Sequence, residues 1–287
     1  MNLFFDVYVR RPKTMRTPHT MEFTKMSGTG NDFIVIDLFH QPVDIDYAQF
    51  ARKYCARKVS VGADGILVLG PGDGTADFTY RIFNADGTEA EMCGNGARCA
   101  AAFAVERSIA GAHMRFRTLA GIVEARVNPD DVSIRVTDPQ GLQQGIAITV
   151  DGRGEVVHHV NTGVPHAVWF TGELEGFPVD AVGRAVRTHP FFAPAGTNVD
   201  FVQVTGPGSI LVRTYERGVE AETLACGTGA VASAIVSHAA GRVDASPVCV
   251  SMPGGNLNID FTCMNGDYTD VWLTGEVSFV YTGTLVL

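Results

Sequence analysis

One segment of this 287-residue chain occurs twice, and that repetition limits the folds open to the chain. The first copy runs from Arg81 to Cys93-Gly-Asn-Gly, and the second runs from Arg213 to Cys226-Gly-Thr-Gly. Each copy reads Arg-x-aromatic-(Asn/Glu), then a short loop holding Glu and Gly, then Cys-Gly-x-Gly-Ala, then an Ala-rich apolar run typical of a helix. Matched residue types at nearly equal spacing favour duplication over chance similarity, so we expect two similar domains.

Short apolar runs separated by turn residues fill most of the remaining chain and predict strands. Residues 46–58 instead have the signals of a helix, with Asp46 near the start and basic residues near the end. Strands and helices do not alternate regularly, which disfavours a doubly wound parallel sheet. We therefore expect a strand-rich chain of the α/β (α+β) class. In the first half of the chain the expected strands are residues 33–38, 66–70, 77–83, 114–118, 121–127 and 132–137.

The first 20 residues differ in character from the rest of the chain. They carry four basic residues and one acid, which interrupts a short apolar run. That run lacks a small-residue cleavage site, so we do not expect a signal peptide. We interpret residues 1–20 as an N-terminal extension and expect the functional chain to begin at Met21. The alternative is an additional strand, because Phe4, Val7 and Val9 are good strand formers.

The composition excludes several classes of protein. Hydrophobic residues make up 46% of the chain, enough for a sizeable core, so a disordered or fibrous chain is ruled out. A chain with a net charge of −9 lacks the basic surface that nucleic-acid binding requires. No run of about 18 apolar residues is present to span a membrane. Six Cys are too few for a disulfide scaffold, so we expect reduced thiols and a cytoplasmic protein.

The repeated Cys-Gly-x-Gly motif places each cysteine at the entry to a helix. Glycine on both sides of the x residue lets the backbone turn tightly and approach a ligand. The free N–H groups and the dipole of the first helical turn favour an anion such as a carboxylate. The same field stabilises a thiolate, so we expect a lowered pKa and raised reactivity for Cys93 and Cys226.

Two such motifs on related domains predict a particular reaction. If pseudo-twofold symmetry brings both helix ends to one cleft, Cys93 and Cys226 face each other across it. One thiolate then removes a proton from one face of a carbon, while the opposing thiol delivers a proton to the other face. The outcome is inversion of a stereocentre beside a carboxylate, with the helix N-termini stabilising the negative charge that develops.

A shortage of lysine bears on the cofactor. Inversion at an amino-acid carbon often uses pyridoxal phosphate, which needs a lysine for its Schiff base. The only lysines are Lys13 in the extension, Lys53 and Lys58 on the charged predicted helix, and Lys25 close to a Gly-rich turn. This shortage favours catalysis without a cofactor.

Several polar residues near the two motifs are candidates for holding a substrate. Glu216 can receive an ammonium group, and Arg217 can clamp a carboxylate with two hydrogen bonds. Asn31, Asn84 and Asn198 offer both donors and acceptors. Together these side chains suit an amino acid that has a second zwitterionic end.

His166 follows a turn and opens a predicted strand. A lone histidine in such a place is more often a hydrogen-bonded structural residue than a functional one. The functional alternative is that His166 tunes one of the cysteines.

From Met21 to the end, the chain resembles the diaminopimelate epimerase family. The Cys93 and Cys226 motifs are specific when they occur together, whereas either alone would also fit proline racemases. The matching segments are Lys25-Met-Ser-Gly-Thr-Gly-Asn31-Asp-Phe33, Gly62-Ala-Asp-Gly65, Arg81-Ile-Phe-Asn84-Ala-Asp-Gly-Thr, Glu91-Met-Cys93-Gly-Asn-Gly-Ala-Arg98-Cys, Gly163-Val-Pro-His166, Gly196-Thr-Asn198-Val-Asp-Phe, Tyr215-Glu-Arg-Gly218, Glu222-Thr-Leu-Ala-Cys226-Gly-Thr-Gly-Ala and Pro253-Gly-Gly.

This resemblance implies a fold of two pseudo-symmetric domains, each a mixed β-barrel-like sheet around a central helix, usually in a homodimer. The implied boundaries are 21–137 for the N-terminal domain, with 277–287 returning to it, and 138–276 for the C-terminal domain. The implied activity is the interconversion of LL- and meso-diaminopimelate, for lysine and peptidoglycan precursors, without a cofactor or metal.

The resemblance also implies roles for individual residues. Cys93 and Cys226 are the implied acid/base pair, with His166 and Glu216 as supporting groups. The implied substrate-binding residues are Asn31, Asn84, Gly94, Asn95, Asn198, Glu216, Arg217, Gly227 and Thr228.

Two positions depart from the family pattern. Many members have Asn where Val164 stands, and some have Gln where Gly65 stands. Val164 cannot hydrogen-bond the distal end of a substrate. The reaction type is unaffected by this difference, but the alternative substrate is another amino acid, such as histidine or proline, handled by a related racemase.

Two further classes compete with an epimerase. A metal or thiol-redox protein is disfavoured because the chain has no Cys-x-x-Cys and no cluster of Cys and His at ligand spacing. A binding module without catalysis would leave the duplicated cysteines without a role, and Ser at both positions would then leave its function intact.

Overall fold

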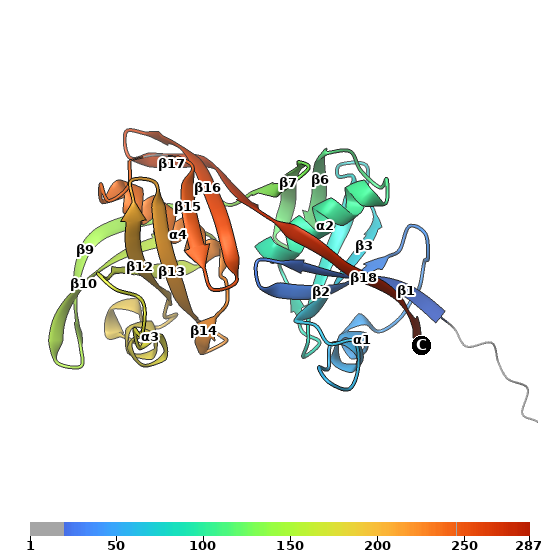
Figure 1. Ribbon diagram of the computed structural model, residues 1–287, viewed down its shortest axis with the longest axis horizontal. Helices are drawn as coiled ribbons and strands as arrows, with labels where there is room; N and C mark the ends of the chain where they lie inside the picture. The colour runs from blue at the N-terminus through green and yellow to red at the C-terminus, as the bar shows by residue number, and fades with distance from the viewer. Residues whose placement is uncertain (1–19, 245) are drawn as a thin grey trace, which may run out of the picture.

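The computed structural model describes residues 20–244 and 246–287. Two halves lie side by side, and each is built from strands around one central helix (Figure 1). The extension expected at residues 1–20 lies, apart from Thr20, outside the described residues. In the part of the chain that the structure describes, no helix is long and apolar enough to cross a membrane.

The N-terminal half contains the first eight strands and the last one. Its helices are α1 (Tyr47–Tyr54) and α2 (Gly94–Glu106). Its strands are β1 (Thr20–Gly28), β2 (Asn31–Asp37), β3 (Gly65–Pro71), β4 (Phe78–Asn84), β5 (Glu89–Ala90), β6 (His113–Thr118), β7 (Gly121–Val127), β8 (Val132–Arg135) and β18 (Val277–Val286).

The C-terminal half contains the strands between them. Its helices are α3 (Val179–Arg187), the short 3-10 helix η1 (Pro190–Phe192) and α4 (Gly227–Ala239). Its strands are β9 (Gln140–Val150), β10 (Arg153–Asn161), β11 (Pro165–Phe170), β12 (Asn198–Gly206), β13 (Ser209–Glu216), β14 (Ala221–Thr223), β15 (Val248–Met252), β16 (Gly255–Met264) and β17 (Asp267–Gly275).

The strands of the two halves are hydrogen-bonded in the same order. One half runs β18-β1-β2-β3-β4-β6-β7-β8. The other runs β9-β10-β11-β12-β13-β15-β16-β17. The parallel pairs also correspond, because β2–β3 and β4–β6 match β11–β12 and β13–β15. The expected pair of similar, mixed, strand-rich domains is therefore confirmed.

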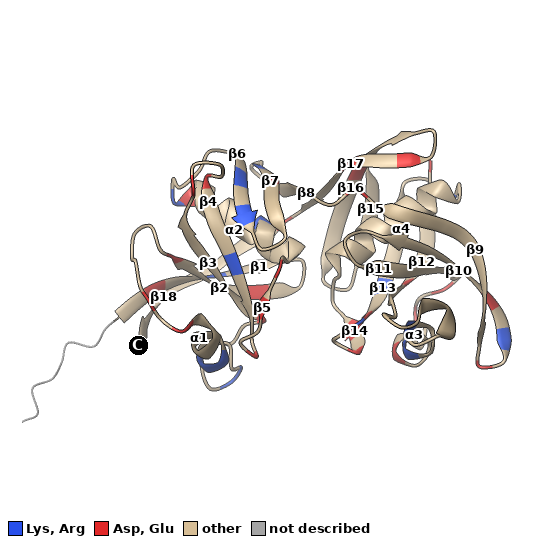
Figure 2. Ribbon diagram, turned by 180° about the vertical axis from the view of Figure 1, so that it is seen from behind, with Lys and Arg blue, Asp and Glu red and all other residues tan. Residues whose placement is uncertain are grey.

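The central helices α2 and α4 are the Ala-rich runs that follow the two cysteines. Small side chains let strands pack against a helix from several sides at close range. Accordingly Ala100 and Ala101 in α2, and Ala232 and Ala234 in α4, have no exposed surface. α4 contains no Lys, Arg, Asp or Glu and is drawn wholly in tan in Figure 2.

The outer helices α1 and α3 each connect two parallel strands and cover the far face of their sheet. α1 begins after Asp46, whose side chain accepts a hydrogen bond from the Gln49 N–H, as its sequence predicts. It ends at Tyr54 rather than at residue 58. α3 was not predicted, although Val179, Val182 and Val186 have the spacing of an apolar helix face.

The repeated arginine has the same partner in both copies. Arg81 on β4 forms a bidentate ion pair with Glu89 on β5, with N···O distances of 2.6 and 3.0 Å. Arg213 on β13 forms the same pair with Glu222 on β14, at 2.6 Å for both bonds. Each pair ties the loop that leads to the cysteine onto the strand before it.

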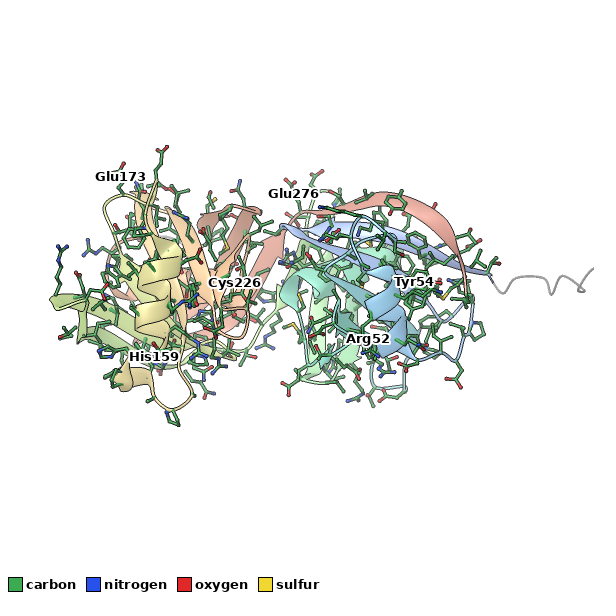
Figure 3. The ribbon with its side chains drawn as sticks, turned by 90° about the horizontal axis from the view of Figure 1, so that it is seen from below. Arg52, Tyr54, His159, Glu173, Cys226 and Glu276 are labelled. Atoms are coloured by element: carbon green, nitrogen blue, oxygen red, sulfur yellow. The ribbon has the colours of Figure 1, made fainter. Side chains whose placement is uncertain are left out.

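The two halves are joined by direct strand pairing. β8 of one half pairs antiparallel with β17 of the other, with Ile134 opposite Leu273. After β17 the chain passes through Glu276, between the halves in Figure 3, and β18 then pairs with β1. The exact domain boundaries, 21–137 with 277–287 and 138–276, stay a prediction.

The backbone at Gly65 leaves no room for a side chain. A Cβ atom there would lie 2.5 Å from the Phe83 carbonyl oxygen, so the Gln of some family members would require the strands to shift. We expect Gly65→Ala to lower the free energy of unfolding by about 1–3 kcal/mol, measured by urea denaturation. Gly154→Ala is the matched control, because a Cβ at this strand glycine meets nothing within 4 Å. Equal stability of the two variants would contradict this packing argument.

Candidate active site

Each of the two repeated cysteines is the residue immediately before a central helix. Cys93 and Cys226 have extended backbones, with φ/ψ of −138°/122° and −124°/108°. Their carbonyl oxygens accept the first helical hydrogen bonds, from Ala97 N at 2.8 Å and from Ala230 N at 2.9 Å. The two motifs therefore have the same local geometry, and each cysteine lies at a helix N-terminus as expected.

One cavity of about 660 Å³ between the halves is lined by both cysteines. Figure 3 shows Cys226 on the side of its half that faces the other half. Nine residues proposed from sequence for catalysis or substrate binding line this cavity: Asn31, Asn84, Cys93, Gly94, Asn95, Glu216, Cys226, Gly227 and Thr228.

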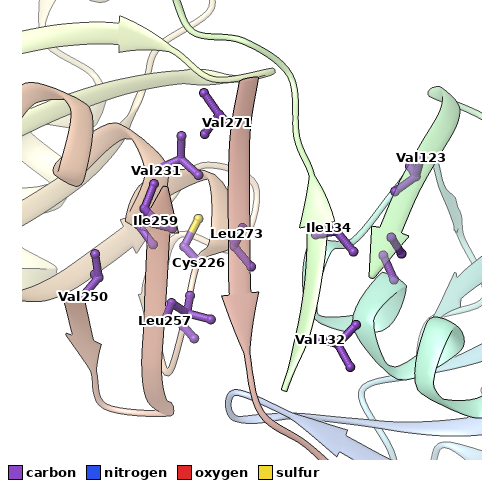
Figure 4. Close-up of a cluster of buried hydrophobic side chains, with 14 of the residues drawn as sticks. Val123, Val132, Ile134, Cys226, Val231, Val250, Leu257, Ile259, Val271 and Leu273 are labelled. Atoms are coloured by element: carbon purple, nitrogen blue, oxygen red, sulfur yellow. The ribbon is translucent and has the colours of Figure 1, made fainter. Parts of the chain in front are cut away.

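Two apolar side chains support the two helix entrances from the paired strands β8 and β17. Ile134 Cδ1 lies 3.6 Å from where a Cβ of Gly94 would be, and Leu273 Cδ1 lies 3.3 Å from the same point at Gly227. Figure 4 shows Leu273 beside Cys226, with Ile134 on the neighbouring strand. Because Ile134 and Leu273 are opposite each other in the register, the strand pairing sets the positions of both motifs.

The N-terminal wall is held by a chain of side-chain hydrogen bonds. Asn31 donates to Asp64 at 2.9 Å and accepts from Asn95 Nδ2 at 2.8 Å. Arg98, fully buried, donates to Asn95 Oδ1 at 2.9 Å. Both amides therefore have a defined orientation toward the cavity. Arg57 extends the chain with a 2.7 Å ion pair to Asp64.

Three of the predicted site residues do not line the cavity. Asn198 accepts a hydrogen bond from the Arg217 backbone N–H at 2.8 Å, and the Arg217 guanidinium donates to the Ala195 carbonyl oxygen at 3.2 Å. His166 is completely buried, and its ring nitrogens contact Asp200 at 2.7 Å and Thr228 Oγ1 at 3.0 Å. Two of the three neighbour a residue that does line the cavity, since His166 contacts Thr228 and Arg217 follows Glu216 in the chain.

The expectation of a lowered pKa for the two cysteines is wrong for Cys93. Burial raises the pKa of the Cys93 thiol. The N–H groups of Gly96 and Asn95 and the charge of Arg98 oppose this shift but do not outweigh it. The helix N-terminus stabilises the thiolate as expected, but the free-energy cost of removing the charged sulfur from water is larger.

The same expectation is wrong for Cys226. Burial raises the pKa of this thiol well above its usual range, and the carboxylates of Glu216 and Asp200 raise it further. Burial also raises the pKa of Glu216, although a 2.5 Å hydrogen bond from Thr223 Oγ1 acts in the other direction. The two cysteines thus share a backbone geometry but differ in their charged neighbours: Arg98 acts on Cys93, Asp200 acts on Cys226, and Glu216 raises the pKa of both.

Sequence reasoning missed several residues of the site. Arg57, Asp64, Thr162 and Thr223 line the cavity, and Asp200 lies behind it. Asp64 belongs to the Gly62–Gly65 segment that carries the family resemblance, which was the available signal. Asp200 follows Asn198 by two residues on the same strand, but its partner His166 is 34 residues away.

The described part of the chain holds no group of three or more His, Cys, Asp or Glu side chains arranged to hold a metal ion.

Comparison with known proteins decides the family. The family model described as diaminopimelate epimerase matches residues 23–140 and 158–280. The diaminopimelate epimerase of Aquifex aeolicus (strain VF5) is 47% identical over 276 residues, which are 92% of this chain and 98% of that protein. The chain belongs to the diaminopimelate epimerase family.

Solved structures at lower identity share the fold of this family member. A Bacillus anthracis phenazine biosynthesis protein of the PhzF family has a TM-score of 0.73 at 14% identity, covering 94% of this chain and 100% of its own. A hydroxyproline epimerase from Agrobacterium vitis has a TM-score of 0.66 at 18% identity, covering 93% and 91%. These similarities confirm the two-domain mixed fold and carry no information on the substrate.

The raised pKa of both cavity thiols predicts their reactivity. Because alkylation requires the thiolate, the rates for Cys93 and Cys226 should keep rising above about pH 9, the ordinary range of a cysteine. Peptide mass spectrometry after timed iodoacetamide treatment measures each site separately. A rate that levels off below about pH 8 at either cysteine would contradict the assignment.

Proposed function

We propose that this chain interconverts LL- and meso-diaminopimelate by a two-base mechanism in which Cys93 and Cys226 are the acid/base pair. The observation that carries the proposal is the single cavity lined by both cysteines, each at the N-terminus of a central helix. Membership of the diaminopimelate epimerase family supports the substrate. The reaction serves the supply of lysine and of peptidoglycan precursors, and the scheme uses no cofactor.

The chemistry follows from the two helix entrances. The backbone N–H groups beside Gly94 and Gly227 bind the carboxylate next to the reacting carbon and stabilise the charge that develops when its proton leaves. One sulfur removes the α-proton, and the other delivers a proton from the opposite side. The α-ammonium group of the substrate brings a positive charge beside the thiols, which favours the thiolate that burial disfavours.

The distal end of the substrate is assigned to residues of both halves. Asn31 and Asn84 face it from one wall, and Glu216 receives its ammonium group from the other. Arg217 follows Glu216 directly, and in this scheme its guanidinium leaves the Ala195 carbonyl oxygen to bind the distal carboxylate. Asn198 assists by holding the Arg217 backbone.

Val164 supports an alternative substrate. It lines the cavity and offers no hydrogen bond to a distal group. A racemase of histidine or proline would need no distal clamp, and Arg217→Ala would then leave its turnover near the wild-type value. Arg217→Ala in a diaminopimelate epimerase should instead raise KM strongly, because a charged end of the substrate loses its partner.

Substitution of the cysteines tests the mechanism. Cys93→Ser and Cys226→Ser should each lower kcat by about 100-fold or more, because a hydroxyl is a far weaker acid/base than a thiol at neutral pH. The measurement is α-proton exchange in deuterated water over LL-diaminopimelate, meso-diaminopimelate, L-histidine and L-proline.

Cys263→Ser is the matched control for these variants, because Cys263 is exposed and does not line the cavity. It should turn over like the wild-type protein. Near-normal turnover by Cys93→Ser or Cys226→Ser would reject the two-base scheme, and exchange on histidine or proline alone would reject the substrate.

A homodimer is part of the proposal, and β18 supports it. Among the described residues β18 pairs with no strand other than β1, and along the middle of its other edge a further strand could pair. Phe279, Val280 and Tyr281 on this strand are 47%, 54% and 46% exposed, an unusual run of apolar surface. A second copy of β18 would satisfy the free edge and cover these side chains.

A charge on β18 tests the dimer. Val280→Asp should shift the protein from dimer to monomer in size-exclusion chromatography with light scattering, because the charge would be buried in the interface. Val156→Asp is the matched control, since Val156 is 55% exposed on a strand of the other half. An unchanged mass for Val280→Asp would contradict the proposed interface.

We place the enzyme in the cytoplasm on chemical grounds. The mechanism needs both cysteines as free thiols, and a reducing compartment keeps them so. All six cysteines of the chain are free in the structure, which agrees with this placement.

A further inference from the structure

Helix α3 lies against a loop that carries two of the residues assigned to the distal end of the substrate, and the mechanism above gives this helix no role. The loop comprises residues 216–223 and includes β14, which lies beside α3 in Figure 1. Near the start of α3, Asp180 Oδ1 accepts a 2.8 Å hydrogen bond from the Glu222 N–H. At its end, Arg187 Nη2 and Nε lie 2.9 and 3.0 Å from Glu220 Oε1. Both ends of α3 therefore hold the same loop.

Glu220 closes this loop into a turn around Arg217. Its carboxylate oxygen Oε1 also accepts a 3.0 Å hydrogen bond from the Gly218 N–H, and Oε2 accepts a 3.3 Å bond from the Tyr215 hydroxyl. Its own backbone N–H donates to the Glu216 carbonyl oxygen at 2.8 Å. The hydrogen bond from Gly218 is the largest cause of a lowered pKa for the Glu220 carboxyl, so this group is ionised at neutral pH. An ionised side chain thus fixes the turn.

The backbone of Arg217 is fixed, whereas its guanidinium contacts a neutral group. The Arg217 N–H donates to Asn198 Oδ1 at 2.8 Å, and the next N–H along the chain, that of Gly218, is held by Glu220. The guanidinium donates to the Ala195 carbonyl oxygen at 3.2 Å. A carboxylate is a stronger acceptor for a guanidinium than a neutral carbonyl group, so a substrate carboxylate can displace it. The turn therefore sets the point from which the Arg217 side chain reaches the substrate.

Arg187 lies between the two segments that Arg217 contacts. A Cβ atom at Gly196 would collide with the Arg187 guanidinium and would lie 2.8 Å from the Arg187 carbonyl oxygen, so this close approach requires glycine. Gly196 directly follows Ala195, the acceptor of the Arg217 guanidinium. The Arg187 side chain is 21% exposed, so its contact with Glu220 is partly shielded from solvent. One guanidinium therefore contacts both the turn that holds Arg217 and the segment to which Arg217 donates.

The N-terminal half has a similar arrangement at its own outer helix. Asn84 is the last residue of β4, as Glu216 is of β13, and both line the cavity. In the turn that follows Asn84, the Asp86 carbonyl oxygen accepts a 3.3 Å hydrogen bond from Arg52 Nη1 on α1 (Figure 3). A Cβ atom at Gly87 would collide with the Arg52 guanidinium. In each half, an arginine of the outer helix supports the turn that follows a residue of the cavity.

We propose that Arg187 and Glu220 are positioning residues that hold the turn around Arg217 and thereby set the affinity of the site for the distal carboxylate of its substrate. The proposal rests on the function proposed above, in which Arg217 binds that carboxylate. Because neither Arg187 nor Glu220 lines the cavity, their effect is on binding and not on the proton transfers.

Substitution on either side of the ion pair tests this role. Arg187→Gln and Glu220→Gln should each raise KM for LL-diaminopimelate about 5–10-fold and leave kcat within about twofold, because binding of the distal end is weakened equally in the ground state and the transition state. Arg187→Lys should recover most of the affinity, since both Arg187 nitrogens contact one carboxylate oxygen and a single ammonium can replace them. Arg184→Gln is the matched control, because Arg184 is exposed on the same helix and makes no ion pair with any described residue. An unchanged KM in either variant of the pair would overturn the proposal.

The opposite charges of the pair separate positioning from plain electrostatics. Arg187→Gln removes a positive charge and Glu220→Gln removes a negative one, so charge alone would shift the KM for a substrate carboxylate in opposite directions. Positioning predicts a rise in both. In an Arg217→Ala background neither substitution should raise KM further, because the group that they position is gone. KM values that move in opposite directions, or that add in full to the effect of Arg217→Ala, would overturn the proposal.

Trypsin measures the turn without any substrate. It cleaves after arginine in segments that open locally, and Arg217 is partly exposed in the turn. Arg187→Gln should raise the rate of cleavage after Arg217 about 5–10-fold, as measured by peptide mass spectrometry. Cleavage after Arg153, which is exposed in the β9–β10 hairpin, is the internal reference and should keep its wild-type rate. An unchanged rate after Arg217 would overturn the proposal.

The two assays also separate this proposal from the proposed function. A wild-type protein without turnover of diaminopimelate would reject the function, and the cleavage rate after Arg217 would still decide whether Arg187 holds the turn. Normal turnover with an unchanged KM in Arg187→Gln and Glu220→Gln would reject the positioning role alone.

Discussion

The antiparallel pairing of β8 with β17 is the contact on which the rest of the structure depends. β8 and β17 each stand at one end of the hydrogen-bonded strand order of their half, and their pairing places Ile134 opposite Leu273. These two side chains lie under the glycines that open α2 and α4. Because both helices are enclosed by their own sheets, the pairing of two strands determines where two helix N-termini and two sulfur atoms lie.

The cavity formed in this way imposes opposing demands on the cysteines. A site that excludes water strengthens hydrogen bonds from the helix N-termini to a carboxylate, which the proposed reaction needs. The same burial disfavours the thiolates and raises the pKa of both thiols. The neighbouring groups then distinguish the two cysteines, since Arg98 acts on Cys93 and Asp200 on Cys226, whereas Glu216 acts on both. Two cysteines with the same backbone geometry but different charged neighbours suit a reaction in which one thiol donates a proton and the other sulfur accepts one.

Local patterns predicted much of the fold and part of the site. The Ala-rich runs became the buried central helices, and the repeated Arg81 and Arg213 took equivalent ion-pair partners. α3 was missed because its apolar residues lie in a short segment among strand-like runs. The pKa of the cysteines was predicted in the wrong direction, because a helix N-terminus can be read from neighbouring residues whereas the depth of burial depends on the whole chain.

The sequence by itself determined that the chain is a duplication, that each copy ends in a cysteine at a helix entrance, and that the family resemblance begins near Met21. These are properties of residues close together in the chain, where spacing and residue type fix the local backbone. Only the tertiary structure decided that the cysteines share a cavity, that Asp64 holds Asn31, and that Asp200 reaches Cys226 through His166 and Thr228. Those contacts join residues from different strands and helices, and strand pairing over long sequence distances is what brings them within hydrogen-bonding range.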